Sequence, residues 1–336
     1  MPLKFALWNM KNVSERSLAR LFEDLETHQR HTNLVAYTNF IRSNNVDLLA
    51  IIEVTIKTGE SAVQQLAASV GQGWGSVTTT DRTYVTRKGE FNSVVFNNAS
   101  TDGSVHVAGV TEANFPQKAS SGTKTTFLNR VPVLFKFALQ QPANKVLQVI
   151  TWHTPQPKHI NIDQELRAFA ESLQDLAILH TNNPSSALAV DVQQPLLVSA
   201  DFNYDTAPSS NQFGPWNRNI YACSLGLAID GYMRNFAGLN NGKPTTLVAK
   251  DPATYANHKN AHIPTTFDDL LANAYDNILV NQLHMSGSVA TVENHLQTHV
   301  AADKLTFTYN PTNCTLEISN ARKISDHCAV IASLTL

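Results

Sequence analysis

Polar side chains stand at the ends of several short apolar segments, at positions that a hydrophobic core would reject. They comprise Asn9 after the run 3–8, Glu53 at the end of 47–53, His153 at the end of 149–153, Asp201 and Asn203 at the end of 196–203, and Asp326 and His327 before the run 328–336. Carboxylate and amide oxygens are ligands of hard divalent cations, and imidazoles beside them can transfer protons. The pattern therefore predicts a hard-oxygen metal site with acid/base groups next to it.

Each of these residues also has an ordinary structural explanation when it is taken alone. Asn9 could form a turn after a strand, and Asp201 with Asn203 could cap a helix. An isolated histidine such as His153 is more often a hydrogen-bonded, partly buried side chain than a catalyst. The joint occurrence of these residues in this order favours a site, because the separate explanations would all have to hold at once.

Short apolar runs rich in β-branched residues predict the strands that position these side chains. The runs are 3–8, 46–53, 92–96, 131–137, 146–152, 196–201, 275–280 and 328–336. Two helices are predicted between them: one capped by Thr32, with Leu34, Tyr37, Phe40 and Ile41 on one face, and one capped by Asn161 or Asp163, with Leu166, Phe169, Leu173 and Leu176. Alternating strands and helices indicate a layered α/β protein, in which ligands gather at strand ends.

The length and composition favour one folded domain. The chain has 336 residues, of which 43% are hydrophobic and 15% charged, which is too apolar for a disordered protein. No internal repeat and no Gly/Ser-rich linker divides it. We therefore expect a single domain over 1–336, with a loop-rich insertion at about 203–264, where Asn, Pro, Ser and Thr are frequent and periodicity is weak.

Charge and cysteine content limit the choice of partners and compartment. Lys and Arg number 25 against 27 Asp and Glu, a formal net charge of -2, so any site for a polyanion must be local. Cys223, Cys314 and Cys328 are widely spaced, which is typical of reduced thiols. The first ten residues lack a signal-peptide pattern, and no apolar stretch is long enough to span a membrane. We expect a cytoplasmic protein.

The candidate residues belong to a longer series of segments. The series is Trp8-Asn9, 47–53, 87–96, 129–132, His153-Thr-Pro155, Asp201-Phe-Asn203, 275–280 and Ser325-Asp-His327. In this order it resembles the metal-dependent endonuclease/exonuclease/phosphatase superfamily, and most of all its deoxyribonuclease I branch. His153-Thr-Pro155 stands where abasic-site endonucleases usually carry a tyrosine. Glu90 precedes a strand, as does the deoxyribonuclease glutamate that bonds the corresponding histidine.

The resemblance implies a fold and a cofactor. The fold is of the α/β class: a four-layer sandwich of two mixed, mainly antiparallel β-sheets with helices on the outer faces. The cofactor is Mg²⁺ or Mn²⁺, held by Glu53 and Asp326 with Asn9 close by. Such a cation would neutralise the scissile phosphate and the charge that grows on its oxygens.

The resemblance also implies which residues contact substrate. Asp201 and Asn203 would orient the attacking water and grip phosphate oxygens or a second ion. Arg130, which precedes a strand, would bind a phosphate through its forked guanidinium. Asn9 would contact the substrate as well as the metal.

The resemblance further implies that two histidines form an acid/base pair. His153 and His327 would flank the phosphate, with Glu90 as the partner of His153 and Asp276 as the partner of His327. A carboxylate partner fixes the imidazole tautomer and raises the imidazole pKa. An in-line displacement requires one such group to accept a proton and the other to donate one.

The expected function is a metal-dependent phosphodiester hydrolase that cuts DNA as an endonuclease. The sequence departs from the family pattern in two places. One departure is small: Ala200 replaces the usual glycine before Asp201. Another concerns the substrate, because the loop that enters a DNA minor groove is not recognisable, although Arg82, Tyr84 and Arg87 lie near its expected place.

Two alternatives to a DNA endonuclease stay open. A phosphatase or phosphodiesterase on inositol phosphates or phospholipid head groups is favoured by the net charge of -2. A catalytically inactive binding protein of the same fold would be expected to have lost ligands, and none is missing here. A regulatory or inhibitory protein partner and the oligomeric state are also open.

Overall fold

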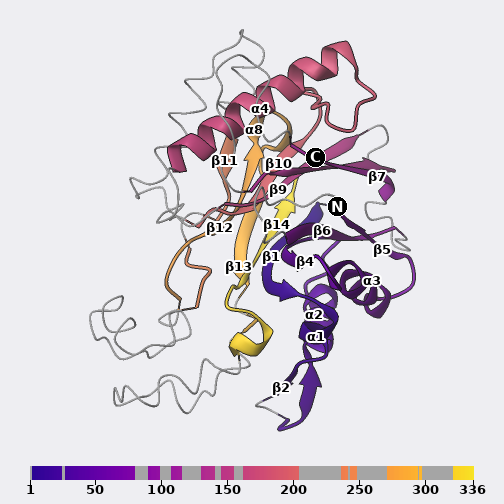
Figure 1. The fold of residues 1–336 in the computed structure, drawn as a ribbon, viewed down its shortest axis with the longest axis vertical. Helices are drawn as coiled ribbons and strands as arrows, with labels where there is room; N and C mark the ends of the chain where they lie inside the picture. The colour runs from indigo at the N-terminus through magenta and orange to yellow at the C-terminus, as the bar shows by residue number, and fades with distance from the viewer. Residues whose placement is uncertain are drawn as a thin grey trace.

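The computed structural model describes most of the chain and shows two β-sheets packed face to face, with helices outside them (Figure 1). The described residues are 2–24, 27–79, 90–98, 107–115, 130–140, 145–154, 162–203, 236–240, 243–247, 271–293, 295–296 and 321–336. This arrangement is the mixed α/β sandwich that the sequence predicts, so the expected fold class is confirmed.

The first sheet has six strands, of which only one neighbouring pair is parallel. Its order is β13 (Val289–Glu293), β14 (Ala329–Leu334), β1 (Leu3–Val13), β4 (Leu48–Thr55), β6 (Glu90–Asn97) and β5 (Trp74–Thr78). β1 and β4 are parallel, and the other neighbours are antiparallel. A parallel pair in the middle of the sheet brings the C-terminal ends of β1 and β4 to the same edge.

The second sheet repeats this plan. Its order is β11 (Phe236–Gly238), β12 (Asp276–Asn281), β10 (Leu196–Asp201), β9 (Val146–His153), β8 (Val133–Leu139) and β7 (Val107–Asn114). β9 and β10 are the parallel pair. A separate two-stranded sheet joins β2 (Leu21–Glu23) and β3 (Arg30–Thr32).

Alternation of side chains along each strand builds the layers. On β1, Phe5 and Leu7 face the core between the two sheets, whereas Ala6 and Trp8 face the outer core. The outer core of the first sheet is covered by α2 (Asn33–Ser43) and α3 (Gly59–Val70), and that of the second sheet by α4 (Ile162–Asn182). Two short helices, α1 (Glu15–Leu18) and α8 (Gln282–Met285), complete the described elements.

The predicted helix starts are only partly right. Thr32 is the N-cap of α2, but its side chain makes no capping hydrogen bond. α4 begins at Ile162, so Asp163 lies inside the helix rather than at its cap, and Asn161 lies outside the described residues. The helix still buries Phe169, Leu173 and Leu176, since the 3.6-residue period of the apolar stripe does not depend on the cap.

Of the expected loop-rich insertion at about 203–264, the structure describes 203, 236–240 and 243–247, so that expectation stays a prediction. Residues 236–238 form β11, an edge strand paired with β12. Thr245 is buried, its Oγ1 accepts from the backbone N–H of Asp276 at 3.1 Å, and its carbonyl accepts from Cys328 N at 2.7 Å. The segment lacks periodicity because backbone pairing, not an apolar stripe, holds it in place. The rest of 203–264 lies outside the described residues.

Two further expectations concern thiols and membranes. Cys328 is buried, while Cys223 and Cys314 lie outside the described residues. In the described part of the chain, no helix combines the length and apolar character that a bilayer crossing needs.

Candidate active site

The predicted site residues come from strand ends that meet at one edge of the sandwich. Asn9 lies near the C-terminal end of β1, Glu53 near that of β4, and His153 and Asp201 at those of β9 and β10. The antiparallel neighbours begin at the same edge and supply Glu90 from β6, Asp276 from β12, and Asp326 and His327 just before β14. In the second sheet, Asp201 lies directly opposite both His153 and Asp276.

The carboxylate of Asp201 is at the centre of these residues. It is buried, and its Oδ2 accepts from Nδ2 of Asn9 at 3.0 Å. The same oxygen lies 3.6 Å from Nε2 of His153 and 3.9 Å from Nε2 of His327. The other oxygen, Oδ1, accepts from the backbone N–H of Asn203 at 2.9 Å. Both imidazoles therefore point their Nε2 atoms at one carboxylate oxygen.

His153 and Glu90 form the first histidine–carboxylate pair. Nδ1 of His153 lies 2.8 Å from Oε1 of Glu90, and Nε of Arg130 lies 3.4 Å from the same oxygen. Burial and the charge of Arg130 lower the pKa of His153, but the charge and hydrogen bond of Glu90, together with the charge of Asp201, outweigh them, so the net shift is upward. Burial raises the pKa of Glu90, but His153 and Arg130 bring it below its ordinary value. The pair therefore favours the charged forms of both groups.

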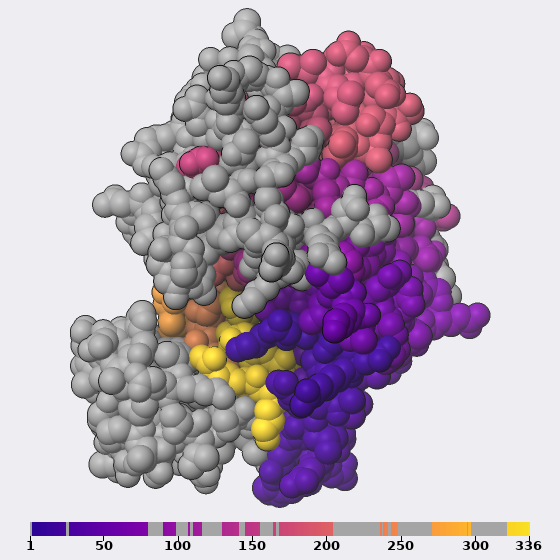
Figure 2. All heavy atoms as spheres, in the orientation of Figure 1, coloured from indigo at the N-terminus to yellow at the C-terminus, as the bar shows by residue number. Residues whose placement is uncertain are grey.

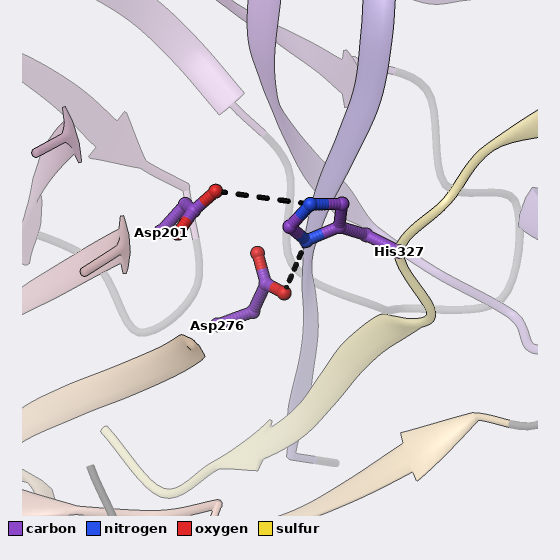
Figure 3. A group of neighbouring side chains, drawn as sticks. All are labelled: Asp201, Asp276 and His327. Carbon is purple, nitrogen blue, oxygen red and sulfur yellow. Dashed lines mark hydrogen bonds and ion pairs between the residues drawn. The ribbon is translucent and has the colours of Figure 1, made fainter. Parts of the chain in front are cut away.

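His327 and Asp276 form the second pair (Figure 3). Nδ1 of His327 lies 2.7 Å from Oδ2 of Asp276, and the imidazole points between Asp276 and Asp201. Burial lowers the pKa of His327, but Asp276, Asp201 and Asp326 together raise it to about 10. In the absence of a bound cation, His327 is therefore charged at neutral pH.

Glu53 and Asn9 lie beside the first histidine, on irregular backbone. Nδ2 of Asn9 donates to Oε1 of Glu53 at 3.2 Å, and Nε2 of His153 lies 3.6 Å from that oxygen. Glu53 has a φ of 62°, in the left-handed region that non-glycine residues rarely adopt. Strand pairing is irregular at the same place, between Ile51 and Val54. Such bulges re-aim side chains next to active sites.

A hydrogen-bonded turn holds Asp326 and His327. Ser325 Oγ donates to the carbonyl of Asn9 at 2.7 Å and accepts from the backbone N–H of His327 at 3.0 Å. Tyr37 OH donates to the carbonyl of Ile324 at 2.7 Å, and Trp8 Nε1 to that of His327 at 2.9 Å. The turn is thus bonded to β1 and α2.

The carboxylate of Asp326 contacts two cations. Lys11 Nζ donates to its Oδ2, and Arg322 Nη1 lies 3.5 Å from the same atom. Burial raises the pKa of Asp326, but His327, Lys11 and Arg322 hold it below its ordinary value. Neither Lys11 nor Arg322 was a candidate from the sequence. The position of Lys11, two residues after Asn9, was the available signal.

Two residues predicted to bind substrate contact the backbone of the His153 loop. Arg130 Nη1 donates to the carbonyl of Thr154 at 3.2 Å and lies 3.5 Å from that of His153. Asn203 Nδ2 donates to the carbonyl of Thr154 at 2.6 Å. These contacts hold the backbone of His153 and Thr154 at the end of β9, and a role of either residue in substrate binding stays a prediction.

The donor atoms at this edge fit a hard divalent cation. Asp201, Asp276 and His327 each offer a ligand atom, and these atoms lie within 4.8 Å of one another. Oδ1 of Asp276 is buried and has no hydrogen-bond partner in the described part of the chain. A buried carboxylate oxygen without a donor is costly unless a ligand satisfies it. This group differs from the predicted ligands Glu53, Asp326 and Asn9, of which Glu53 and Asn9 lie beside Asp201.

Comparison with solved structures identifies the fold. No family model matches the sequence, and no curated protein does. An endonuclease/exonuclease/phosphatase from Bacteroides vulgatus matches with a TM-score of 0.52 at 13% identity, over 100% of this chain and 99% of its own. A family protein from Bacteroides thetaiotaomicron gives 0.51 at 12%, over 99% and 97%. A mannosyl-6-phosphatase from that organism gives 0.50 at 12%, over 99% and 100%.

The chain therefore has the fold of endonuclease/exonuclease/phosphatase proteins. The similarity shows the fold that the resemblance implied. Because identity is this low, the comparison concerns the fold, and the chemistry has to be argued from the site.

Proposed function

We propose that this protein is a divalent-metal-dependent phosphodiester hydrolase, and that its substrate is DNA. One observation carries the proposal: two imidazoles, each bonded through Nδ1 to its own carboxylate, direct Nε2 at the carboxylate of Asp201. A matched pair of imidazoles that faces one polar centre suits proton transfer to and from a substrate between them.

The two histidines take different roles in the proposed reaction. Glu90 raises the pKa of His153, so His153 can act as a base only in the fraction of molecules in which it is neutral; in that form Nδ1–H stays bonded to Glu90 and Nε2 can accept a proton from water. His327, whose pKa is raised to about 10, is the charged partner and can donate a proton to the leaving oxygen. The oxygen of the water bonds to phosphorus as the bond to the leaving oxygen breaks, so the two proton transfers balance the hydrolysis. Asp201 and Asn203 orient the water.

Glu53 and Asp326, with Asn9, are the residues proposed to hold Mg²⁺ or Mn²⁺. Buried Asp276 Oδ1 and the carboxylate of Asp201 offer further oxygen donors beside them. When bound, the cation supplies positive charge that stabilises the charge developing on the phosphate oxygens.

The contact between His153 and Glu90 supports the deoxyribonuclease I-like branch and hence DNA as substrate. In the sequence this pairing was the feature that separated that branch from abasic-site endonucleases. The distance of 2.8 Å between Nδ1 and Oε1 shows that the two side chains are bonded.

The proposal is tested by incubating the protein with supercoiled plasmid, single-stranded DNA, RNA and inositol phosphates, with Mg²⁺, with Mn²⁺ and with EDTA. We expect plasmid nicking that needs the cation. Glu53→Gln keeps the size of the side chain but removes its charge, and should slow nicking at least about a hundredfold, or about 2.7 kcal/mol in the barrier. High metal should restore part of the rate. Full activity in EDTA, or an unaffected Glu53→Gln protein, would contradict the proposal.

A phosphatase acting on small phosphate esters is the second candidate. The net charge of -2 favours it, because long DNA is held by many cationic contacts. One structurally similar protein is a mannosyl-6-phosphatase. Release of inorganic phosphate from inositol phosphates, without plasmid nicking, would establish this alternative.

A further inference from the structure

Lys11 brings a cation of the chain itself to the proposed metal site. Its ammonium donates to Oδ2 of Asp326, across the junction of β1 with the turn before β14. Figure 2 shows indigo atoms of the N-terminal segment directly against yellow atoms of the C-terminal segment on one face of the molecule. The charge that Asp326 would offer to a divalent cation is therefore already partly neutralised.

The backbone that directs Lys11 to Asp326 is strained. Lys11 and Asn12 have φ values of 53° and 58°, so two successive non-glycine residues are left-handed. The pairing of β1 with β4 shifts register between Asn9 and Val13, around these residues. Non-glycine residues rarely adopt this conformation, and it persists where the surrounding structure holds it, often at functional sites. A regular strand would alternate side chains between its two faces instead.

The two cations on Asp326 differ in how firmly they are held. Arg322 is mostly buried, with 13% of its side chain exposed, and its Nη2 also donates to the carbonyl of Leu247 at 3.0 Å. The side chain of Lys11 is 44% exposed and carries a single charge on a flexible stem. The backbone N–H of Lys11 donates to Oδ1 of Asn9 at 3.1 Å, so the main chain stays in place when the ammonium moves. Lys11 is thus the cation that can leave.

We propose that Lys11 is a tethered cation that competes with the divalent metal for Asp326 and thereby sets the metal affinity of the site. This inference rests on the metal-binding part of the proposed function. Metal entry requires the ammonium to withdraw into solvent, where its exposed position lets it be hydrated. The competition weakens metal binding and, in the metal-free protein, adds a second cation to the one that Arg322 supplies to Asp326.

The test is calorimetric titration of Mn²⁺ into the full-length, metal-free protein. Lys11→Met keeps the length of the side chain without its charge, and should lower the Kd for Mn²⁺ on the order of tenfold, the ratio that about 1.4 kcal/mol gives. Lys11→Arg should bind Mn²⁺ like the wild type. Lys57→Met removes the same charge from an exposed lysine after β4 and should leave Kd unchanged, which controls for net charge.

A second readout is the rise in melting temperature with added Mn²⁺, which should be larger in Lys11→Met than in wild type. If Lys11→Met does not fold, Lys11→Gln replaces it. Equal Kd values for wild type and Lys11→Met would overturn this inference alone. Absence of Mn²⁺ binding in both would overturn it together with the proposed metal site. Binding in Lys11→Met but not in wild type would support it in its strongest form.

Discussion

At the scale of single residues, the chemistry depends on what each histidine contacts through its two nitrogens. Nδ1 is bonded to a carboxylate in both cases, which leaves Nε2 for the reaction. Asp201 Oδ2 lies near both Nε2 atoms and so couples the two imidazoles. Changes at one histidine should therefore alter the behaviour of the other.

The histidine pair makes a kinetic prediction. His153→Ala and His327→Ala should each lower the rate about 10² to 10⁴-fold. Because both serve one transition state, the double variant should lose less than the product of the single losses. Glu90→Gln should cost less than His153→Ala, because the imidazole remains and loses only its orienting charge. A normal rate with reduced thermal stability in His153→Ala would mean that this histidine only packs.

The raised pKa of His327 makes a prediction about stability against pH. A group whose pKa is higher in the folded protein stabilises it fully below the unfolded pKa, near 6.5, and loses that effect as pH rises through the folded value of about 10. In EDTA, the unfolding free energy of wild type should therefore fall relative to His327→Gln between these limits. Denaturant unfolding of both proteins at pH 6, 8 and 10 measures this difference in unfolding free energy. Parallel curves for the two proteins would show that Asp276 does not hold the imidazolium.

At the scale of elements, the site needs short segments that fix strand ends. The turn before β14 is bonded to Tyr37 of α2 and Trp8 of β1, and the segment 243–247 is bonded to both Asp276 and the turn. Leu247 N donates to the carbonyl of Asp326 at 2.8 Å. The segment 243–247 therefore holds the backbone of Asp276 in β12, and of Asp326 and Cys328 before β14, by hydrogen bonds.

Removal of 236–247 tests this element. The deletion strips β11 from the edge of β12 and leaves the backbone N–H groups of Asp276 and Cys328 without their partners. Each unsatisfied buried group costs about 1–3 kcal/mol. We expect a large loss of melting temperature. A deletion confined to 208–230, outside the described residues, is the comparison, and is predicted to alter substrate preference more than stability. If both deletions melt like wild type, neither segment belongs to the fold.

At the scale of the whole molecule, the site exists because two sheets meet. Asn9 of the first sheet donates to Asp201 of the second, and Glu90 of the first sheet is bonded to His153 of the second. His327, which lies just before β14 of the first sheet, is bonded to Asp276 of the second. The separation of the sheets, set by the core between them, therefore sets the site distances. Apolar side chains from both sheets fill this core.

A cavity in that core should affect stability and catalysis together. Phe135 of β8 is fully buried between the sheets, and Phe135→Ala should cost about 3–5 kcal/mol of unfolding free energy. Because the sheets can shift, activity at a temperature where the protein is still folded should also fall. Val289→Ala, at a side chain that is 62% exposed, should change stability by less than about 0.5 kcal/mol. Chemical denaturation of both variants measures these changes in unfolding free energy.

Local patterns in the sequence were enough to predict most of the described strands and to place candidate site residues at strand ends. An apolar run that ends in a polar residue indicates a buried strand, whatever surrounds it. Asn9, Glu53, His153 and Asp201 all lie at or near the ends of such strands, and their roles stay a prediction. Helix α3 was missed although Ala62, Val63 and Leu66 follow a helical period, because its small side chains make a weak stripe. β11 was missed because a three-residue edge strand has no period to detect.

Only the tertiary structure decided which strand ends meet and what lies between them. The contact of Lys11 with Asp326 joins residues 315 positions apart, and the bond from Tyr37 to Ile324 spans 287. Nothing local to either partner specifies such contacts, since they follow from the register of β1 with β14 and from a bulge in β1. The types of the site residues are thus written in the chain, whereas their pairing and their protonation arise from the packing of two sheets.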